Sequence, residues 1–425
     1  MLFKLKSLIT DSIYFLVKLN LIKLSGRFWT TLHLKKVLEG TKFPEISINK
    51  IAFLVHDDIS FDHIQNVIKN LPQGTFDIIL VNYKGIFCFS HVLDIILNRT
   101  YTKIQTDKIK NIIKKSYPFC RLRTIHEVIE SRERYCWLVC GHNGLNHTAR
   151  CIIKDNLVYG ANLLADHLAY FQFAIDPDQA SNVKNCQVFD KIFCVGAWQA
   201  KLFRGMPIKA KVFDYGSPRF DSKIQSHDNL DVKALLDNDN HFDCSKRTIL
   251  WLPTHTKATT VVDFLPNMQN LTQEYNVLLK AHTDCFSEMK GLENVIRKNA
   301  PDVTLVKDKD SADLMGIADF VCCDYGGSVF TAIGMDKNVI LLNSKHDSFA
   351  RRHFCTDCKN GKIKLRDNIV NFYYNEQEKI LNALRDSSVW ERQSLIRKNL
   401  REQYLSVHKE PSGKLIADEL LSGLE

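Results

Sequence analysis

The feature that most constrains the fold is a series of short apolar runs that alternate with segments of helical spacing. In the first half of the chain these runs are IAFLVHD, FDIILVNY, RYCWLVCG and DKIFCVG, which begin at residues 51, 76, 134 and 190. Helix-like segments lie between or after them, including SHVLDIIL from residue 90 and AWQAKLFR from residue 197. Strands that are apolar throughout are typical of parallel sheets, because helices cover both faces of such sheets. The first half therefore predicts a parallel α/β domain.

The same alternation restarts after a polar stretch from Ser222 to Lys246, which we interpret as a linker region. The second set of apolar runs is RTILWLP, NVLLKAH, VTLV, DFVCCD and NVILLN, which begin at residues 247, 276, 303, 319 and 338. A chain of 425 residues is long enough for two to three domains. We predict an α/β fold with two doubly wound, Rossmann-like domains that face a cleft, spanning 46–240 and 241–375, followed by C-terminal helices over 376–425.

Residues 1–45 combine apolar residues at helical spacing with several lysines. No window reaches the roughly 18 uncharged residues that a membrane span needs, because Asp11 and Lys18 interrupt the best candidate. No small-residue cleavage site of a signal peptide follows. Two interpretations remain open: a basic amphipathic helix that lies on an anionic membrane surface, or a helix that packs its apolar stripe on the protein's own core.

The composition limits the classes of partner and cofactor. The formal net charge of +9 suits anionic partners, but no nucleic-acid-binding module accompanies it, so we expect no nucleic-acid partner. The 13 cysteines show no disulfide-framework spacing, which favours reduced thiols in the cytoplasm. Cys355 and Cys358, near His353, form a single CxxC pair, which is a weak zinc signal, so we predict neither a metal nor a cofactor. Cys322 and Cys323 lie inside an apolar run and are predicted core residues.

Polar and glycine residues follow several of the predicted strands, where open α/β sheets bind their ligands. Asp324 and Tyr325 precede Gly326, Gly327 and Ser328 at the start of a predicted helix. The glycines permit close backbone approach, and the N–H groups at a helix start favour a phosphate. The alternative is an ordinary turn in which the serine caps the helix.

Three further clusters occupy comparable positions. His282 follows NVLLKA and could act as a general base or as a hydrogen-bond donor to phosphate, or be purely structural. Hydroxyl, imidazole and ammonium groups follow ILWLP at Thr254, His255 and Lys257, where an anion could bind unless the loop is simply solvated. Arg219 in YGSPRFD offers a forked guanidinium to an anion, unless it only shapes the interdomain loop with Asp221.

The segments GSPRFD, LWLPTHTK and VLLKAH, together with the run from Asp310 to Asn343, resemble the CDP-glycerol glycerophosphotransferase family. This family comprises teichoic-acid primases and polymerases and related capsule enzymes with the GT-B fold. The order and spacing of its motifs match over roughly Phe189 to Asn343, whereas the first 130 residues resemble it weakly.

The resemblance implies a transferase that moves a glycerol-phosphate or related alditol-phosphate from a CDP-alditol to a hydroxyl acceptor and releases CMP. The acceptor would be a polyol-phosphate, glycan or lipid-linked molecule in cell-envelope or capsule synthesis, bound on the side of the N-terminal domain. It also implies a cytoplasmic protein, peripheral at the inner face of the cell membrane. Two alternatives are a GT-B glycosyltransferase that uses a nucleotide sugar, and an inactive scaffold of an envelope-assembly complex.

The resemblance also implies roles for individual residues. His282 matches the family's strand-end histidine, Arg219 its interdomain arginine, and Gly327 and Ser328 its phosphate-binding turn. The donor-binding residues that we predict are Arg219, Thr254, Lys257, Asp324, Gly326, Gly327 and Ser328.

Two features depart from the family pattern. The family's D-Y-S-S-type turn is Asp-Tyr-Gly-Gly at 324–327, which removes one hydroxyl donor. The N-domain His-Gly motif, whose histidine is a proposed general base, has no clear equivalent. We choose His142 as the second catalytic residue, with Tyr159-Gly160, which lacks the histidine, and His167 as alternatives.

Overall fold

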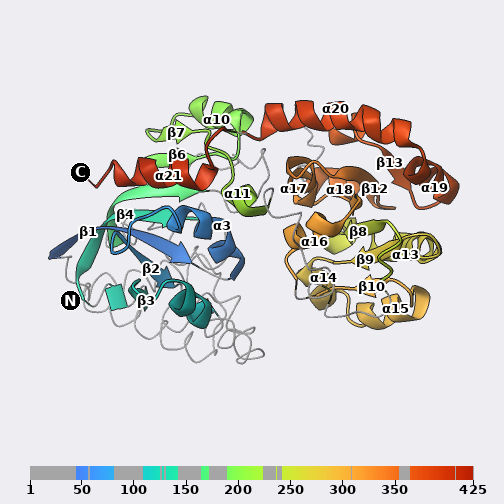
Figure 1. The fold of residues 1–425 in the computed structure, drawn as a ribbon, viewed down its shortest axis with the longest axis horizontal. Helices are drawn as coiled ribbons and strands as arrows, with labels where there is room; N and C mark the ends of the chain where they lie inside the picture. The colour runs from blue at the N-terminus through green and yellow to red at the C-terminus, as the bar shows by residue number, and fades with distance from the viewer. Residues whose placement is uncertain are drawn as a thin grey trace, which may run out of the picture.

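The structure is a computed structural model in which two parallel sheets form two α/β domains (Figure 1). It describes residues 45–55, 58–80, 109–124, 127–128, 131–141, 164–171, 189–223, 236, 242–307, 309–353, 364–406 and 408–424. The proposed N-terminal helix and the segment SHVLDIIL lie outside these residues. None of the described helices is both long enough and apolar enough to cross a bilayer.

The N-terminal sheet has the strand order β3-β2-β1-β4-β5-β6-β7, and each pairing is parallel. Its strands are β1 (Ile46–Val55), β2 (Phe76–Leu80), β3 (Leu122–Thr124), β4 (Glu133–Cys140), β5 (Ala165–Phe171), β6 (Lys191–Phe193) and β7 (Lys211–Phe213). The order reverses direction between β1 and β4, which makes the carboxyl ends of these two strands the switch point where such sheets bind ligands.

Helices cover both faces of this sheet, as the apolar strands require. Ile51 and Phe53 of β1 pack in a core with α3 (Asp58–Ile68), while Ala52 and Leu54 face a second core with α10 (Ala197–Arg204). The short helix α11 (Arg219–Lys223) ends the described part of this domain before the polar stretch.

The C-terminal sheet has the strand order β10-β9-β8-β11-β12-β13, again with parallel pairings. Its strands are β8 (Thr248–Leu252), β9 (Asn276–Leu279), β10 (Thr304–Leu305), β11 (Phe320–Cys323), β12 (Asn338–Asn343) and β13 (Asn371–Tyr373). Numbered from its first strand this is the order 3-2-1-4-5-6 of nucleotide-binding Rossmann domains. The switch point lies between β8 and β11.

The helices of this domain cover both faces of the sheet. They are α13 (Val261–Leu271), α14 (Thr283–Glu288), α15 (Leu292–Asn299), α16 (Ser311–Ile317), α17 (Ser328–Gly334), α18 (Asp347–His353), α19 (Gln377–Arg385) and α20 (Ser387–Tyr404), with 3₁₀ turns at η2 (Thr256–Ala258) and η4 (Leu365–Asp367). Leu250 and Leu252 of β8 face the core under α16 and α17, whereas Ile249 and Trp251 face the core under α13 and α15.

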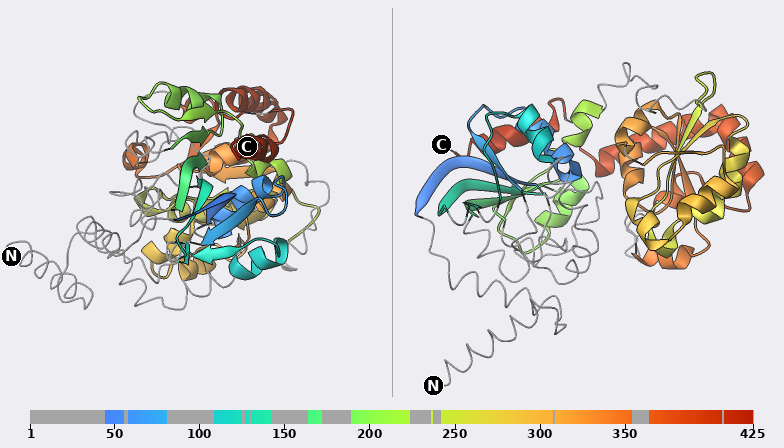
Figure 2. Two further views of the ribbon diagram at one scale, coloured as in Figure 1. Left: turned by 90° about the vertical axis from the view of Figure 1, so that its left-hand side faces the viewer. Right: turned by 90° about the horizontal axis from the view of Figure 1, so that it is seen from below.

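The chain returns to the N-terminal domain at its end. The helix α20 reaches from the C-terminal domain to α10, where the rings of Trp198 and Tyr404 lie 5.5 Å apart. The last helix, α21 (Ser412–Leu421), then packs Ile416 and Leu420 into the core of β1 and α3 (Figure 2). The C-terminal helices thus contact the N-terminal domain as well as the C-terminal one.

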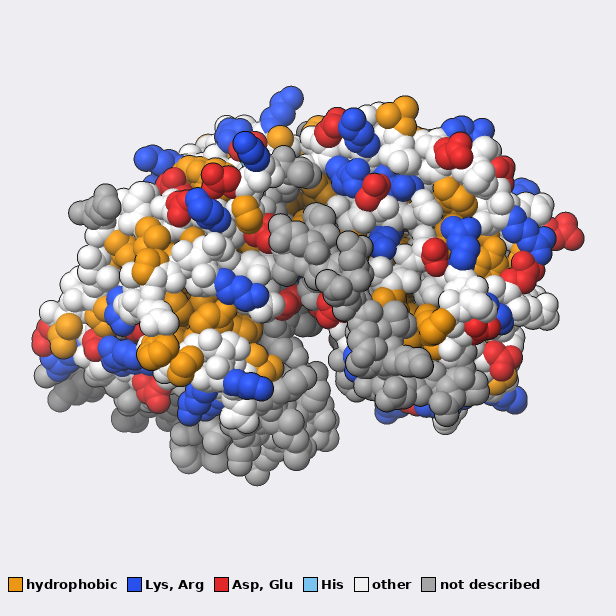
Figure 3. Space-filling view, viewed as in Figure 1, with side chains coloured by type: hydrophobic (Ala, Val, Ile, Leu, Met, Phe, Trp, Pro, Cys, Tyr) orange, Lys and Arg blue, Asp and Glu red, His pale blue; other side chains and the backbone are white. Residues whose placement is uncertain are grey.

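These sheets confirm the prediction of two doubly wound α/β domains. The short strands β3, β7 and β13 were not predicted, because LRT, KVF and NFY each contain polar residues and none of their residues is fully buried. The strand β5 was missed as well, because ADHLAYF places two exposed polar residues near its start. In the space-filling view basic and acidic side chains are interspersed over the described surface of both domains (Figure 3).

Candidate functional site

Three loops lie side by side at the carboxyl edge of the C-terminal sheet, because β9, β8 and β11 are adjacent and parallel. His282 follows β9, Thr254 follows β8, and Asp324 follows β11. The structure therefore brings together most of the predicted donor-binding residues and His282. In Figure 1, α14 and α16, which follow β9 and β10, lie on the side of this domain that faces the N-terminal domain.

Asp324 holds two of these loops together. Its carboxylate is fully buried and accepts hydrogen bonds from the backbone N–H groups of Thr254 (2.9 Å), Tyr325 (2.6 Å) and Thr260 (3.3 Å). Burial raises the pKa of this carboxyl to about 6, although these N–H groups favour its charged form. The carboxylate is occupied by backbone N–H groups. Asp324 could therefore contribute to binding of a donor substrate only by positioning the loops that would touch it.

The turn from Gly326 to Ser328 is the part of this loop that reaches the surface. Gly327 is exposed, and Gly326 and Ser328 are partly exposed. A Cβ atom on Gly326 would lie 3.4 Å from the Thr254 hydroxyl, so the backbone of the turn lies against the end of β8. The Ser328 hydroxyl lies 3.5 Å from the Cys323 sulfur. Both Cys322 and Cys323 are buried, as predicted.

His282 caps α14 with its side chain. Its Nδ1 accepts a hydrogen bond from the backbone N–H of Asp284 at 3.2 Å, and its ring is about half exposed. The ring stacks on that of His255, with 4.6 Å between the ring centroids and 30° between the planes. Burial and the neighbouring His255 lower the pKa of His282, against the opposing effect of two acidic neighbours, Asp284 and Glu288.

Glu288, at the end of α14, binds the loop that carries His255. One carboxylate oxygen lies 3.3 Å from His255 Nδ1, and the other accepts the backbone N–H of Thr256 at 2.7 Å. The sequence analysis did not single out Glu288. Its helical position, six residues after His282, gave no signal, since the contact depends on how β8 and β9 pair.

The two lysines near this loop differ in their surroundings. Lys257 lies exposed in η2, whereas Lys280 donates a hydrogen bond to the backbone carbonyl of Lys307 at 3.0 Å. Of the two lysines, Lys257 is therefore the one whose side chain could rotate to place its ammonium group on an anion at the end of β8.

His255, His282 and Asp284 present potential metal-ligand atoms that all lie within 4.8 Å of one another. The lone pair of His282 Nδ1 already accepts the Asp284 N–H, so a metal at that nitrogen would compete with the helix cap. Cys355 and Cys358 lie outside the described residues.

Arg219 lies at the junction of the domains. Its guanidinium contacts Asp310 Oδ2 at 2.6 Å and Asp62 Oδ2 at 3.5 Å, and its side chain is only 11% exposed. Asp62 belongs to α3, and Asp310 caps α16, so Arg219 connects one domain to the other. The alternative was that Arg219 contacts Asp221. The carboxylate of Asp221 instead accepts the backbone N–H groups of residues 412 and 413 at the start of α21.

The candidates for a second catalytic histidine have different outcomes. His142 and Tyr159-Gly160 lie outside the described residues, although Gly141 directly follows β4 at the switch point of the N-terminal sheet. His167 is the third residue of β5, not a strand-end residue. It stacks on Trp137 at 4.9 Å between centroids and lies 3.7 Å from Asp190.

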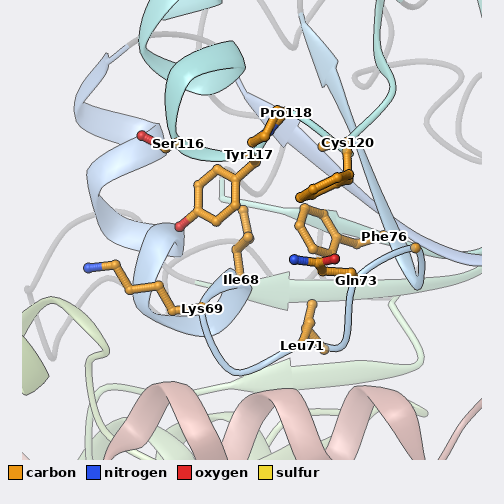
Figure 4. Close-up of a pocket in the computed structure, with 11 residues that line it drawn as sticks. Ile68, Lys69, Leu71, Gln73, Phe76, Ser116, Tyr117, Pro118 and Cys120 are labelled. Atoms are coloured by element: carbon orange, nitrogen blue, oxygen red, sulfur yellow. The ribbon is translucent and has the colours of Figure 1, made fainter.

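A pocket in the N-terminal domain lies away from this edge. It lies between the end of α3 and the loop at residues 117–120, next to the start of β2 (Figure 4). Ile68, Phe76, Tyr117 and Cys120 line it, and burial raises the pKa of the Cys120 thiol to about 12. Since Phe76 begins β2, this pocket opens at the amino edge of the sheet, opposite the edge where parallel sheets bind their ligands.

No family model matches the chain, and no curated protein is similar to it in sequence. Solved structures do resemble its fold. A structure of the wall teichoic acid polymerase TagF has a TM-score of 0.58 at 12% identity, over 94% of this chain and 97% of that one. Another is the UDP-GlcNAc 2-epimerase from Neisseria meningitidis bound to UDP-GlcNAc, with a TM-score of 0.50 at 12% identity, over 88% and 100%.

A third is S. aureus MnaA in complex with UDP, with a TM-score of 0.52 at 12% identity, over 88% of this chain and 95% of that one. At such low identity the likeness concerns the fold alone. Together with the two parallel sheets and the C-terminal return, it identifies the architecture as the two-domain GT-B fold.

Proposed function

We propose that this protein is a GT-B transferase that moves an alditol-phosphate unit, such as glycerol-phosphate, from a CDP-alditol to a hydroxyl acceptor. The observation that carries the proposal is the set of strand ends at the C-terminal switch point. There an exposed glycine turn at the start of α17, the Thr254 hydroxyl and the His282 ring lie along one edge. This is where a Rossmann domain of this strand order binds a nucleotide.

The hydrogen bonds of His282 support a specific role. Because Nδ1 accepts the Asp284 N–H, the proton of the neutral ring is on Nε2. That Nε2–H can donate a hydrogen bond to a phosphoryl oxygen, where negative charge develops during transfer. A neutral ring of this tautomer cannot also accept a proton at Nε2, so we assign the acceptor's proton to another group.

The proposed reaction is an in-line displacement. The acceptor oxygen forms a bond to the phosphorus that bears the alditol, and the bond from that phosphorus to the bridging oxygen breaks. CMP leaves with the bonding electron pair, and a base takes the proton of the acceptor hydroxyl. The predicted base, His142, would act from the N-terminal domain, on the side from which the acceptor would enter.

The partners follow from charge and from the resemblance. A net charge of +9 suits both an anionic donor and a polyol-phosphate, glycan or lipid-linked acceptor near an anionic membrane surface. We propose that the protein works in the cytoplasm, peripheral at the inner face of the cell membrane.

The experiment is a measurement of nucleotide release by the purified full chain. CDP-glycerol, CDP-ribitol, a CMP-sugar and UDP-GlcNAc are each offered with a lipid-linked or capsule-fragment acceptor. Release of CMP from a CDP-alditol that depends on the acceptor supports the proposal. His282→Asn serves as the control, because asparagine also caps helices but lacks the imidazole donor.

A GT-B glycosyltransferase is the second candidate, because two of the similar folds were solved with UDP or UDP-GlcNAc. Release of nucleoside phosphate from a nucleotide sugar, with none from either CDP-alditol, would replace the proposal by this candidate. Binding of envelope-assembly partners without release from any donor would instead favour an inactive scaffold.

A further inference from the structure

A buried arginine binds the residue at which the glycine turn after β11 begins. Arg366, in η4, has only 7% of its surface exposed. Its Nη2 donates hydrogen bonds to the backbone carbonyl oxygens of Asp324 at 2.9 Å and Leu342 at 3.3 Å, and its Nε donates to Asn343 Oδ1 at 2.6 Å. One guanidinium thus connects the start of the turn to the end of β12.

The ring of Tyr325, the second residue of this turn, extends the contact to another loop. The guanidinium carbon of Arg366 lies 4.1 Å from the centroid of this ring, which is buried. Tyr325 packs with Ala258 of η2 and Ala350 of α18, and its hydroxyl donates a hydrogen bond to Asp347 Oδ1 at 2.5 Å. Arg366 therefore supports, directly and through Tyr325, both loops at which the proposed donor would bind.

The charge of Arg366 has a further consequence for an anionic ligand. Burying a guanidinium is costly unless its N–H groups are bonded, and an apolar side chain could fill the same space at a lower cost in free energy. Asp324 supplies the opposite buried charge, because burial raises the pKa of its carboxyl and Arg366 is among the groups that oppose this rise. The guanidinium therefore offsets a carboxylate that would repel a phosphate at Gly326 and Gly327.

We propose that Arg366 is a positioning residue of the donor site: it holds the turn at 324–327 and η2 in the arrangement that receives a nucleoside diphosphate. This deepens the proposed function, on which it rests, because it assigns the support of the phosphate-binding turn to a residue outside the predicted donor-binding set. Lysine should not replace Arg366, because an ammonium group lacks the planar fork that reaches Asp324 and Asn343 together.

The test compares Arg366→Lys with Arg397→Lys in the full chain. Arg397 is the matched control, because it is also buried in this domain but bonds Asp336 and Asn338 at the amino end of β12, the opposite edge of the sheet. Calorimetric titration with CDP measures binding. Hydrogen exchange measures the local stability of residues 324–330 and 256–260, and urea unfolding measures the global stability.

We expect Arg366→Lys to weaken CDP binding about tenfold, as for the loss of one hydrogen bond from a charged donor, and to speed exchange in both segments. Arg397→Lys should lower the urea midpoint but leave CDP binding and exchange in these segments unchanged. Tyr325→Phe keeps the ring and removes the hydroxyl that binds Asp347, so it should show the same local changes. It takes the place of Arg366→Lys if that variant does not fold.

Wild-type CDP affinity or exchange in Arg366→Lys, or in Tyr325→Phe where it takes that place, would overturn the proposal. An equal loss of CDP affinity in both arginine variants would do the same, because it would reflect a general loss of stability. A wild-type protein that binds no CDP would refute the donor site itself, and this inference with it. CDP binding that depends on Arg366, without CMP release from any CDP-alditol, would instead refute the transferase and leave the positioning role.

Discussion

At the scale of single residues, the chemistry of the site depends on which atoms the backbone already occupies. The sequence showed that His282 and Asp324 follow strands, but not what their side chains contact. Asp324 is turned inward, onto the N–H groups of neighbouring loops. His282 uses Nδ1 to cap α14, so Nε2 is the nitrogen that our proposal assigns to a ligand. Two positions that look equivalent in sequence thus differ in what their side chains contact.

The first prediction concerns His282. His282→Asn should lower kcat for CMP release by on the order of 10²–10³, because it removes one charge-stabilising donor. His282→Ala should show the same loss of rate and should also cost about 1 kcal/mol of stability, because it removes the cap of α14. Steady-state kinetics and urea unfolding measure the two effects. Wild-type turnover in His282→Asn would contradict the proposed role.

The second prediction concerns pH and Asp324, whose pKa burial raises from 3.8 to about 6. The folded state then binds a proton more readily than the unfolded state. The contribution of Asp324 to the free energy of unfolding is therefore fully present below about pH 4 and is lost as the pH rises towards about 6. The loss is on the order of 3 kcal/mol.

Asp324→Asn should remove this part of the pH dependence, and it should also be less stable, because an amide N–H₂ faces backbone N–H donors. Urea unfolding between pH 4 and 7, followed by the fluorescence of the buried Trp251, measures both effects. An Asp324→Asn protein whose free energy of unfolding keeps the wild-type slope over this range would rule out this account of the carboxyl.

At the scale of the elements, the sequence predicted where several strands end, but not which of the following loops lie next to one another. The predicted strands β8, β9 and β11 stand out in the sequence as apolar runs, and each is followed by the expected loop. The strand order, however, decides that the loop after β8 lies between those after β9 and β11. This order brings His255 onto His282 and Glu288 onto His255, across 27 and 33 positions of the chain.

The third prediction concerns the contact between α10 and the end of α20. A Cβ atom on Gly196, which precedes α10, would lie 2.0 Å from the backbone carbonyl oxygen of Tyr404. Gly196→Ala should therefore lower the free energy of unfolding by about 1–3 kcal/mol, since the backbone has to move. Gly205→Ala, at the other end of α10, is the control, because its nearest neighbours would lie at 3.5 Å. Equal stabilities of the two variants in urea unfolding would refute the close approach.

At the scale of the whole molecule, the two domains are joined by more than a linker. The C-terminal helices return to the N-terminal domain, and Arg219 connects α3 to the cap of α16. The sequence analysis placed Arg219 in the donor site, as the family resemblance implies. In the structure its guanidinium contacts two carboxylates at the junction. Replacing Arg219 would therefore affect binding of a donor substrate partly by changing how the two domains are positioned.

The fourth prediction tests this junction. Arg219→Gln leaves the carboxylates of Asp62 and Asp310 without the guanidinium between them. It should lower the free energy of unfolding by about 1–3 kcal/mol. Hydrogen exchange should become faster in α3 and at the start of α16. The control is Arg385→Gln, which removes an exposed pair with Glu274 inside one domain. Unchanged exchange at both segments in Arg219→Gln would show that the contact does not hold the domains together.

The sequence by itself determined the class of the fold and several of the loops that follow its strands. Continuous apolar runs can be buried only when both faces of a sheet are covered, and polar loops must then follow the strands. The tertiary structure decided which of these loops touch, because strand order and the C-terminal return are set by contacts between distant segments. For that reason the His255–Glu288 contact and the interdomain role of Arg219 became visible only when the strands were placed side by side.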